Sequence, residues 1–429
     1  MSTTTDHPSG APRSDAGSAP APPDRRTIPR PAAFWLVAVM SALMLFSVSA
    51  QTPMYVVYQQ RWGFSDTMIT VTFAVYALFV LVSMVLFGSL SDSAGRRPVL
   101  GLSFALLVVA MIVFAAAQNV GWLMAGRAIQ GIAVGIATGP LAAALIELAP
   151  PGSPRRGPLA GSVSPPAGLA CGSVAAGLLL YGPWPTVLCY ILLLAVFLLA
   201  LGVVALLPET APNATGRLRF APRRVSVPRE VRRPFAVVSL TITAVWSVGG
   251  VYLSLGPTIV SDLLHSQSHL LEGVVVTSLA GCGALAQLLI GHRLTGGRPI
   301  LLGGALMFTG LGLVLLALSQ GWSPLFFGGS VVLGLGWGSA FMGAFRMMAA
   351  LAPPARRGEV LGAVYLVGYL AMSLPNIAVG IAVRFASLLD TATVFIALVG
   401  AVIVAALAGL PMARPRAARQ PGPVPQPQP

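Results

Sequence analysis

Apolar residues along this chain gather in twelve long runs, which short polar or Pro- and Gly-containing breaks separate. A helix that crosses a hydrocarbon core of about 30 Å needs about 20 apolar residues, because each residue rises about 1.5 Å. Every run has about this length, so the pattern predicts twelve membrane-spanning helices. Their expected limits are residues 34–58, 66–90, 98–117, 121–148, 159–181, 185–207, 235–261, 270–292, 299–319, 324–351, 359–385 and 390–411.

The composition agrees with this pattern. Of the 429 residues, 56% are apolar and only 9% are charged, and the mean hydropathy is +0.83. A soluble chain would carry about 25% charged residues, so an ordinary soluble enzyme and a disordered chain are both excluded. The cysteines Cys171, Cys189 and Cys282 lie inside apolar runs without CxxC spacing. They predict neither a disulfide framework nor a metal site.

Charge adds the orientation. All 26 basic residues are arginines, and with 12 acids they give a net charge of +14. If the N-terminus is cytoplasmic, 22 of the 26 fall on the cytoplasmic side, against Arg61 and Arg384 outside. This asymmetry predicts a multi-pass protein of the cell (inner) membrane with both termini in the cytoplasm. It also removes nucleic acid as a partner, because the basicity reports topology and attraction to the lipid bilayer.

Short motifs recur about 200 residues apart. Arg97-Pro98 returns as Arg298-Pro299, Gly121-Trp122 returns as Gly321-Trp322, and residues 148–157 resemble residues 351–358. These echoes predict an all-α protein with two parallel six-helix halves, which is a design of transporters that rock around a central site. The expected organisation is a disordered cytoplasmic tail (1–32), a first half (33–207), an Arg-rich cytoplasmic linker (208–234), a second half (235–411) and a second disordered tail (412–429).

The loop after the second span reads GSLSDSAGRRP. Its glycine at 95 suits a turn with positive φ, and its acid can pair with an arginine. Here the chain resembles the major facilitator superfamily, whose signature in this loop is G-x-L-x-D-x-x-G-R-R/K. The matching residues are Gly88, Leu90, Asp92, Gly95, Arg96 and Arg97. The corresponding second-half loop, residues 291–298, lacks the acid. The resemblance covers almost the whole chain and implies secondary transport by alternating access, without enzymatic activity or a cofactor.

Two further motifs resemble those of proton-coupled members of that family. Residues 126–131 are similar to R-x-x-Q-G, which implies a role for Arg127 and Gln130 in proton coupling. An arginine inside a span normally faces the protein interior or a water-filled cavity, although its side chain could instead reach the outer surface. In the fifth span, Gly168, Gly172 and Gly177 match the G-x-x-x-G-P-x-x-G-G pattern of drug/proton antiporters, with Ser173 replacing the proline. Small residues at this spacing also mark close helix packing.

The acids lie at helix ends, and none lies near the centre of a predicted span. In members of the family, an acid at the end of span four joins the loop motif. We therefore expect Asp92, Arg96 and Glu147 to form a charged latch, with the start of span eleven, near Gly358 and Glu359, as its helix-dipole partner. The alternative for Glu147 is a charge that extends from a helix end into solvent.

The resemblance places the substrate cavity between spans one, four, seven and ten, with contributions from spans two and eleven. The candidate residues there are aromatic or neutral, apart from arginines, and they suit an amphipathic, neutral or anionic substrate. An alternative for each aromatic residue is that it serves only in packing. Besides Arg127 and Gln130, the candidates are Gln51, Tyr55, Tyr76, Thr138, Trp246, Tyr252, Trp337, Phe341, Arg346, Tyr365, Tyr369 and Asn376.

The sequence therefore predicts a monomeric proton-coupled exporter of small organic or drug-like molecules. The alternative within transport is a facilitator or importer of a metabolite such as a sugar or an organic acid. A membrane enzyme would need clustered His, Asp, Glu or Cys, and a sensor would need a sizeable soluble domain. His265 and His269 have i,i+4 spacing near Asp262, but a zinc site needs more ligands, so no metal is predicted. Without any lysine the chain has no ATP-binding Gly-x-x-x-x-Gly-Lys motif.

Overall fold

The computed structural model describes residues 27–153, 155–211, 226–263, 268–290, 293–353 and 356–413, and these residues form helices and connecting turns without a strand. Twelve of the described helical spans are long and apolar enough to cross a membrane. The first half contains α1 (Arg30–Ser49), α2 (Thr52–Trp62), α3 (Asp66–Phe87), α4 (Leu90–Ala94), α5 (Arg96–Ala115), α6 (Val120–Glu147), α7 (Arg156–Leu179) and α8 (Leu188–Leu206). The second contains η1 (Arg229–Val231), α9 (Arg232–Ser254), α10 (Gly256–Thr258), η2 (Ile259–Leu263), α11 (His269–Ile290), α12 (Arg298–Gln320), α13 (Ser323–Leu351), α14 (Arg357–Ala382), α15 (Leu388–Gly409) and η4 (Leu410–Ala413).

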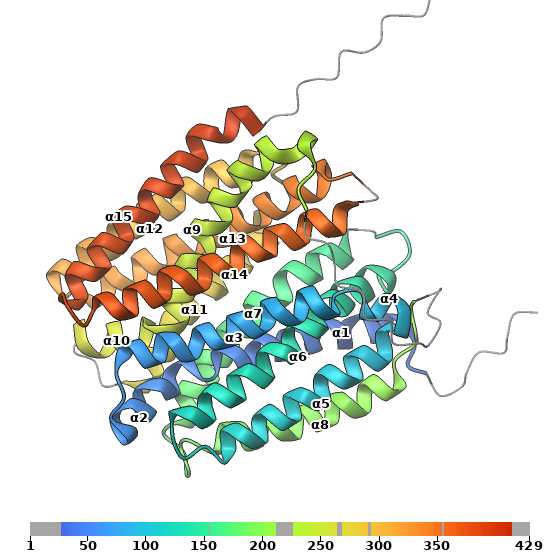
Figure 1. The fold of residues 1–429 in the computed structure, drawn as a ribbon, viewed down its shortest axis with the longest axis horizontal. Helices are drawn as coiled ribbons and strands as arrows, with labels where there is room; N and C mark the ends of the chain where they lie inside the picture. Colours follow the sequence, from blue (N-terminus) through green and yellow to red (C-terminus); the bar gives the residue numbers. More distant parts are fainter. Residues whose placement is uncertain are drawn as a thin grey trace, which may run out of the picture.

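The helices form two six-span halves that lie side by side. Figure 1 shows the first half, blue to green, below the second, yellow to red. The halves meet mainly where α7 packs against α11 and where α3 packs against α14. We call the end where α8 ends and α9 begins the linker end, and the end that carries α2, α10 and the start of α11 the opposite end.

The internal repeat occupies equivalent places in the two halves. Arg97-Pro98 lies in the first turn of α5, and Arg298-Pro299 opens α12. Gly121-Trp122 lies at the start of α6, and Gly321-Trp322 directly precedes α13. The twelve spans predicted from the apolar runs and the two halves predicted from these repeats are confirmed.

The first span of each half is broken, which corrects the continuous helices expected over 34–58 and 235–261. The first breaks after Ser49 and restarts as α2, with Pro53 in the first turn of α2. The seventh breaks after Ser254, and Pro257 opens α10. Proline removes a backbone donor and clashes with the preceding turn, but it fits the first turn of a new helix. Pro165 and Pro166, in contrast, lie inside the continuous helix α7.

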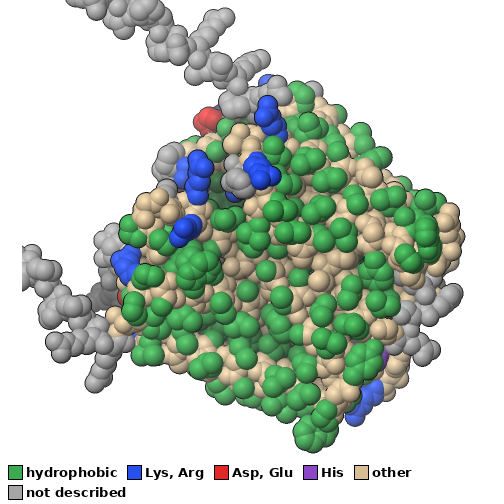
Figure 2. All heavy atoms as spheres, turned by 180° about the vertical axis from the view of Figure 1, so that it is seen from behind, with side chains coloured by type: hydrophobic (Ala, Val, Ile, Leu, Met, Phe, Trp, Pro, Cys, Tyr) green, Lys and Arg blue, Asp and Glu red, His purple; other side chains and the backbone are tan. Residues whose placement is uncertain are grey.

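The outer surface is apolar where a bilayer would contact it. Figure 2 shows a face covered largely by apolar side chains, with most of the visible arginines gathered along one edge. Large apolar side chains are exposed over the whole molecule; Leu199 of α8 and Leu398 of α15, for example, have exposed fractions of 70% and 63%. A protein surrounded by water rarely exposes so large an apolar area, whereas lipid tails solvate it. The chain is therefore an all-α, multi-pass membrane protein.

Candidate functional site

A cavity of about 200 Å³ lies between the two halves. Its walls come from α1, α3, α6 and α7 of the first half and from α9, α11, α13 and α14 of the second. It runs from Val48 and Leu253 to Leu145, Gly161 and Ser162 on the side of the linker end. None of the described lining residues carries a charge.

Hydrogen bonds join the halves between this cavity and the opposite end. The Thr277 hydroxyl of α11 donates to the Ala170 carbonyl of α7 at 2.7 Å. The Thr52 hydroxyl of α2 donates to the Leu253 carbonyl of α9 at 2.9 Å. The Thr67 hydroxyl of α3 likewise bonds to a carbonyl of α14. The opposite end is thus held closed in this structure, while the cavity extends toward the linker end.

Five aromatic residues form one wall of the cavity, on the second half. The ring centres of Trp246 and Tyr369 lie 4.7 Å apart, and Trp337 stacks on Phe341 at 6.4 Å. The indole Nε1 of Trp337 donates to the Val245 carbonyl at 2.7 Å, which fixes the ring. Tyr365 completes the group, with its ring centre 6.2 Å from that of Trp246. The wall therefore offers a preformed surface on which a planar or apolar ligand could stack.

Gln287 of α11 supplies an unpaired polar group in this apolar wall. It is fully buried, and neither the nitrogen nor the oxygen of its amide has a hydrogen-bond partner among the described residues. An unpaired buried amide costs about 1–3 kcal/mol. A ligand with a donor and an acceptor would recover that free energy. The sequence prediction missed Gln287, although a single polar residue within an apolar span was a usable signal.

Arg127 of α6 is fully buried beside the cavity, so the alternative that its side chain reaches the outer surface is wrong. Its Nε donates to the Tyr55 hydroxyl at 2.8 Å. Its Nη1 donates to Gln130 Oε1 at 3.0 Å and to the Val48 carbonyl at 3.3 Å. The Gln130 amide nitrogen in turn donates to the Ser47 hydroxyl at 3.1 Å. The two residues of the R-x-x-Q-G motif therefore share one buried polar network.

The break between α1 and α2 provides an acceptor for Arg127. The last carbonyls of a helix have no partner within the helix, and α1 ends one residue after Val48. The Val48 carbonyl is therefore free to accept from Arg127. Gln51, which precedes α2, donates to Gln130 at 3.4 Å. The break at Pro53, which lies far from Arg127 in sequence, therefore helps to explain which groups accept the hydrogen bonds of Arg127.

No carboxylate compensates the Arg127 charge among the described residues. The guanidinium lies 5.5, 5.8 and 5.4 Å from the ring centres of Tyr55, Phe73 and Tyr76, and its Nη2 has no hydrogen-bond partner. Ring faces and neutral oxygens stabilise a cation less than a carboxylate does. Phe73 and Tyr76 also line the cavity. A positive charge therefore lies directly behind the cavity wall.

The structure divides the predicted cavity residues into two groups. Seven of them line the cavity, namely Tyr76, Thr138, Trp246, Trp337, Phe341, Tyr365 and Tyr369. Four others do not, because each is turned into a polar contact between helices: Gln51 with Gln130, Tyr55 with Arg127, Tyr252 with Ser330, and Asn376 with Ser254. The resemblance thus indicated six of the spans that line the cavity, but not the contribution of α7 and α11 or the face that each side chain occupies.

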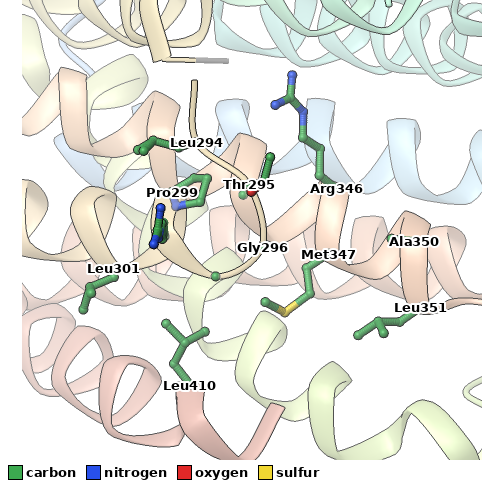
Figure 3. Close-up of a pocket in the computed structure, with 13 residues that line it drawn as sticks. Leu294, Thr295, Gly296, Pro299, Leu301, Arg346, Met347, Ala350, Leu351 and Leu410 are labelled. Atoms are coloured by element: carbon green, nitrogen blue, oxygen red, sulfur yellow. The ribbon is translucent and has the colours of Figure 1, made fainter. Parts of the chain in front are cut away.

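Arg346 lies outside the central cavity as well. It borders a separate hollow of about 600 Å³ at the linker end of the second half, beside Leu294, Met347 and Leu410. Figure 3 shows the Arg346 side chain pointing away from Leu410, whereas Met347 points toward it. Arg346 is exposed and lies near the end of α13.

The loop motif forms an ion-paired cluster at the linker end. Arg96 Nη1 lies 2.6 Å from Asp92 Oδ1, and Arg96 Nη2 lies 3.2 Å from Glu147 Oε1. Leu90 is buried against Val99 and Ile136, which anchors α4. The three residues of the expected latch are thus in contact. Gly88 ends α3 with ordinary helical backbone angles.

Glu209, at the start of the segment between the halves, caps this cluster. Its two carboxylate oxygens accept from the backbone N–H groups of Arg96 and Arg97 at 2.8 and 3.0 Å, at the N-terminus of α5. Gly95 has a φ of +103°, and a Cβ there would lie 2.6 Å from Glu209 Oε2. Glycine is therefore required at position 95 for two reasons: the turn needs a positive φ, and a Cβ would collide with the Glu209 carboxylate. No sequence pattern predicted that Glu209 would pair with this motif.

Gly95→Ala is expected to lower the stability of the fold by about 1–2 kcal/mol, since alanine strains the positive φ and displaces Glu209. Glu209→Gln should cost less, because the amide oxygen still accepts one N–H. The double variant should be less destabilised than the sum of the two, because both changes remove the same cap. Thermal unfolding midpoints in detergent measure all three, and strict additivity would contradict the shared cap.

The predicted helix-dipole partner of the latch has other contacts. Glu359, in the first turn of α14, is 3.1 Å from Arg356 Nε and accepts from the Ser226 hydroxyl. On the first half, Glu147 similarly accepts from the Thr210 hydroxyl. The two described ends of the segment between the halves are therefore attached to the last turn of α6 and the first turn of α14.

The fifth-span glycines serve two interfaces. A Cβ at Gly168 would lie 2.0 Å from the Ala42 carbonyl oxygen, and one at Gly172 would lie 2.2 Å from that of Phe46. Both positions pack against α1. A Cβ at Gly177 would lie 2.5 Å from the His269 carbonyl oxygen of α11, in the other half. Close packing accounts for all three.

Comparison with known proteins places this arrangement in a family. A family model described as the Major Facilitator Superfamily matches residues 37–376. No curated protein sequence matches this chain significantly.

Solved transporter structures share the fold. A POT family transporter in complex with 5-aminolevulinic acid has 12% identity and a TM-score of 0.71, covering 90% of this chain and 96% of that one. A bacterial homolog of the human lysosomal transporter Spinster, in an inward-facing and unoccupied conformation, has 13% identity and a TM-score of 0.67, covering 91% and 99%. The human organic anion transporter MFSD10 has 17% identity and a TM-score of 0.65, covering 90% and 100%.

Proposed function

Because this chain belongs to the Major Facilitator Superfamily, we propose that it exports small amphipathic organic molecules, neutral or anionic, in exchange for protons. Transport across a membrane is the activity of the family. The observation that carries the substrate class is the uncharged aromatic cavity with the unpaired Gln287 amide in its wall and the Arg127 charge behind it. A cationic substrate would lack a carboxylate partner among the described lining residues.

The parts of the cavity suggest a division of labour in binding. The aromatic wall of the second half would stack against the apolar part of a substrate. Gln287 would hydrogen-bond to its polar group, and Arg127 would attract a negative charge across Phe73 and Tyr76. One similar structure is named an organic anion transporter, which supports the anionic class for this chain.

We further propose that the linker end faces the cytoplasm, because most of the described arginines lie there, against Arg61 and Arg384 at the opposite end. Those at the linker end include Arg96, Arg97, Arg155, Arg156, Arg232, Arg233, Arg356 and Arg357. The structure then represents the inward-facing state, and alternating access would open the opposite end as the linker end closes. A cysteine replacing Gln118, exposed at the opposite end, should react in intact cells with a reagent that cannot cross membranes. If this cysteine does not react, the proposed orientation is wrong and the opposite end faces the cytoplasm.

Proton coupling rests on the R-x-x-Q-G motif and its buried network. The second candidate is a facilitator or importer of a metabolite. The observation that favours it is the lack of a carboxylate among the described cavity-lining residues, where coupled carriers often hold one.

Transport into proteoliposomes decides between these functions. We expect uptake of neutral or anionic amphipathic molecules, from a panel of antibiotics, organic acids and sugars, to follow an imposed pH gradient and to stop with a protonophore. Protein-free liposomes are the control. Uptake that only equilibrates the substrate and ignores the pH gradient would indicate a facilitator. Preferential uptake of organic cations would overturn the proposed substrate class.

A further inference from the structure

Glu272 is a buried acid at the boundary between the two halves. It lies in the first turn of α11, the helix that packs against α7, and its side chain is only 2% exposed. His269 Nδ1 lies 3.1 Å from Glu272 Oε2, and the histidine side chain is 28% exposed. Among the described residues, Glu272 is the only acid that is buried.

The helices around this pair touch through their backbones. A Cβ at Gly177 would lie 2.5 Å from the His269 carbonyl oxygen, and a Cβ at Gly273 would lie 2.5 Å from the Ser173 carbonyl oxygen. These contacts lie on either side of Glu272. The Tyr181 hydroxyl is also within 3.3 Å of the Ser268 hydroxyl. We call this contact region between α7 and α11 the gate, because it must separate if the opposite end opens.

Among the described residues of the neighbouring elements, none carries a charge that pairs with Glu272. Its one ion pair among the described residues is with His269. Asp262 of η2 is exposed and accepts from the Ser261 hydroxyl at 2.7 Å. Arg346 of α13 lies at the linker end. The titratable side chains at or near the other elements packed against α11 are Tyr181 and Cys171 on the α7 side, Tyr55, Tyr58 and Arg61 on α2, and Tyr252 on α9. Arg156 of α7 and Arg232 and Arg233 of α9 lie at the first turns of these helices, at the linker end.

We propose that Glu272 and His269 form a proton-binding site of the gate, and that the gate closes only when this pair holds a proton. With one proton the pair is neutral overall, whichever residue carries it. Without a proton, a carboxylate charge would be buried in the closed gate without a countercharge, which is costly. When the gate opens, water reaches Glu272 and that cost disappears. Closure therefore binds the proton more tightly, and by linkage the bound proton favours closure.

The inference rests on the alternating access of the proposed function, and it adds a proton site outside the cavity. Among the described residues, no carboxylate pairs with Arg127, so the Arg127 network holds no acid that could bind and release a proton. Glu272 would supply such an acid.

The proposed proton site is tested by measuring the distance between the two halves at the opposite end. Spin labels are placed on cysteines that replace Gln118 and Ala386, exposed residues on the two halves, in a chain whose three native cysteines are alanines. For the otherwise unchanged protein, we expect the ratio of open to closed gate to rise at least about tenfold between about pH 5 and about pH 9. Glu272→Gln should reduce this change to less than about twofold and keep the gate closed.

Two further variants make the result specific. His269→Gln leaves Glu272 without its partner, so the transition should persist but shift to lower pH. Asp262→Asn removes an exposed acid from the same end and should retain the full tenfold change. The proposal is overturned if Glu272→Gln keeps the pH response, if Asp262→Asn abolishes it, or if the label distance of the parent protein does not depend on pH.

Failure of the inference and failure of the proposed function give different results. If the parent protein moves no substrate in proteoliposomes but its gate responds to pH through Glu272, the transport proposal fails and the proton site stands. If proton-driven transport is observed while Glu272→Gln retains the pH response of the gate, the transport proposal stands and the proton site is wrong.

Discussion

Replacing Arg127 with methionine is expected to weaken the binding of an anionic substrate by about 5- to 30-fold, since the attraction of a charge across the rings of Phe73 and Tyr76 is worth about 1–2 kcal/mol. Binding of a neutral analogue of the same shape should change little. The fold should survive, because the lost hydrogen bonds to Tyr55 and Val48 are offset by removing an uncompensated buried charge. Calorimetric titration with the anion identified in proteoliposomes, and with its neutral analogue, measures the difference.

The matched control for this variant is Arg61→Met, which removes an exposed arginine near the end of α2. It should leave both affinities unchanged. Equal losses for the anion and the neutral analogue in Arg127→Met would show that Arg127 supports the shape of the cavity and not the charge of the substrate.

Two glycines on the same helix are expected to have different effects when enlarged to valine. Gly172→Val forces α7 away from α1, where the Phe46 carbonyl oxygen is 2.2 Å from the new Cβ, and should cost about 1–3 kcal/mol of stability or more. Gly177→Val acts between the halves, against the His269 carbonyl. It should leave each half folded but hold the gate open. Thermal unfolding and the Gln118–Ala386 label distance separate the two effects.

Gly202→Val is the control for both, since no atom lies within 4 Å of a Cβ at that position of α8. It should change neither the thermal midpoint nor the label distance. A closed gate in Gly177→Val, together with a thermal midpoint as low as that of Gly172→Val, would contradict the assignment of Gly177 to the contact between the halves.

The spans and the two halves were predictable from sequence because they depend on local properties. The length of an apolar run decides whether a helix can cross a bilayer, and the echoes at Arg97 and Arg298 fall where equivalent helices begin. The ion pair of Arg96 with Asp92 was also within reach, since the two residues are four apart in one loop motif.

The faces of the helices were not predictable from sequence. In a membrane protein, apolar residues cover both the lipid side and the packed side, so periodicity does not show which way a tyrosine points. Tyr55 and Tyr76 look alike in sequence, yet one holds Arg127 and the other also lines the cavity. The broken spans are a partial exception, because Pro53 and Pro257 were visible but their effect depends on where the next helix restarts.

The two proline breaks have a mechanical consequence. They fall in the equivalent first spans of the two halves, and the Thr52–Leu253 hydrogen bond links them directly. Helices α2 and α10 are thus jointed to α1 and α9, whose longer segments line the cavity. A joint absorbs bending that a continuous rod would transmit. Movement of α2 and α10 is thereby decoupled from α1 and α9, so the part of the cavity wall that α1 and α9 form can keep its geometry while these two short helices move.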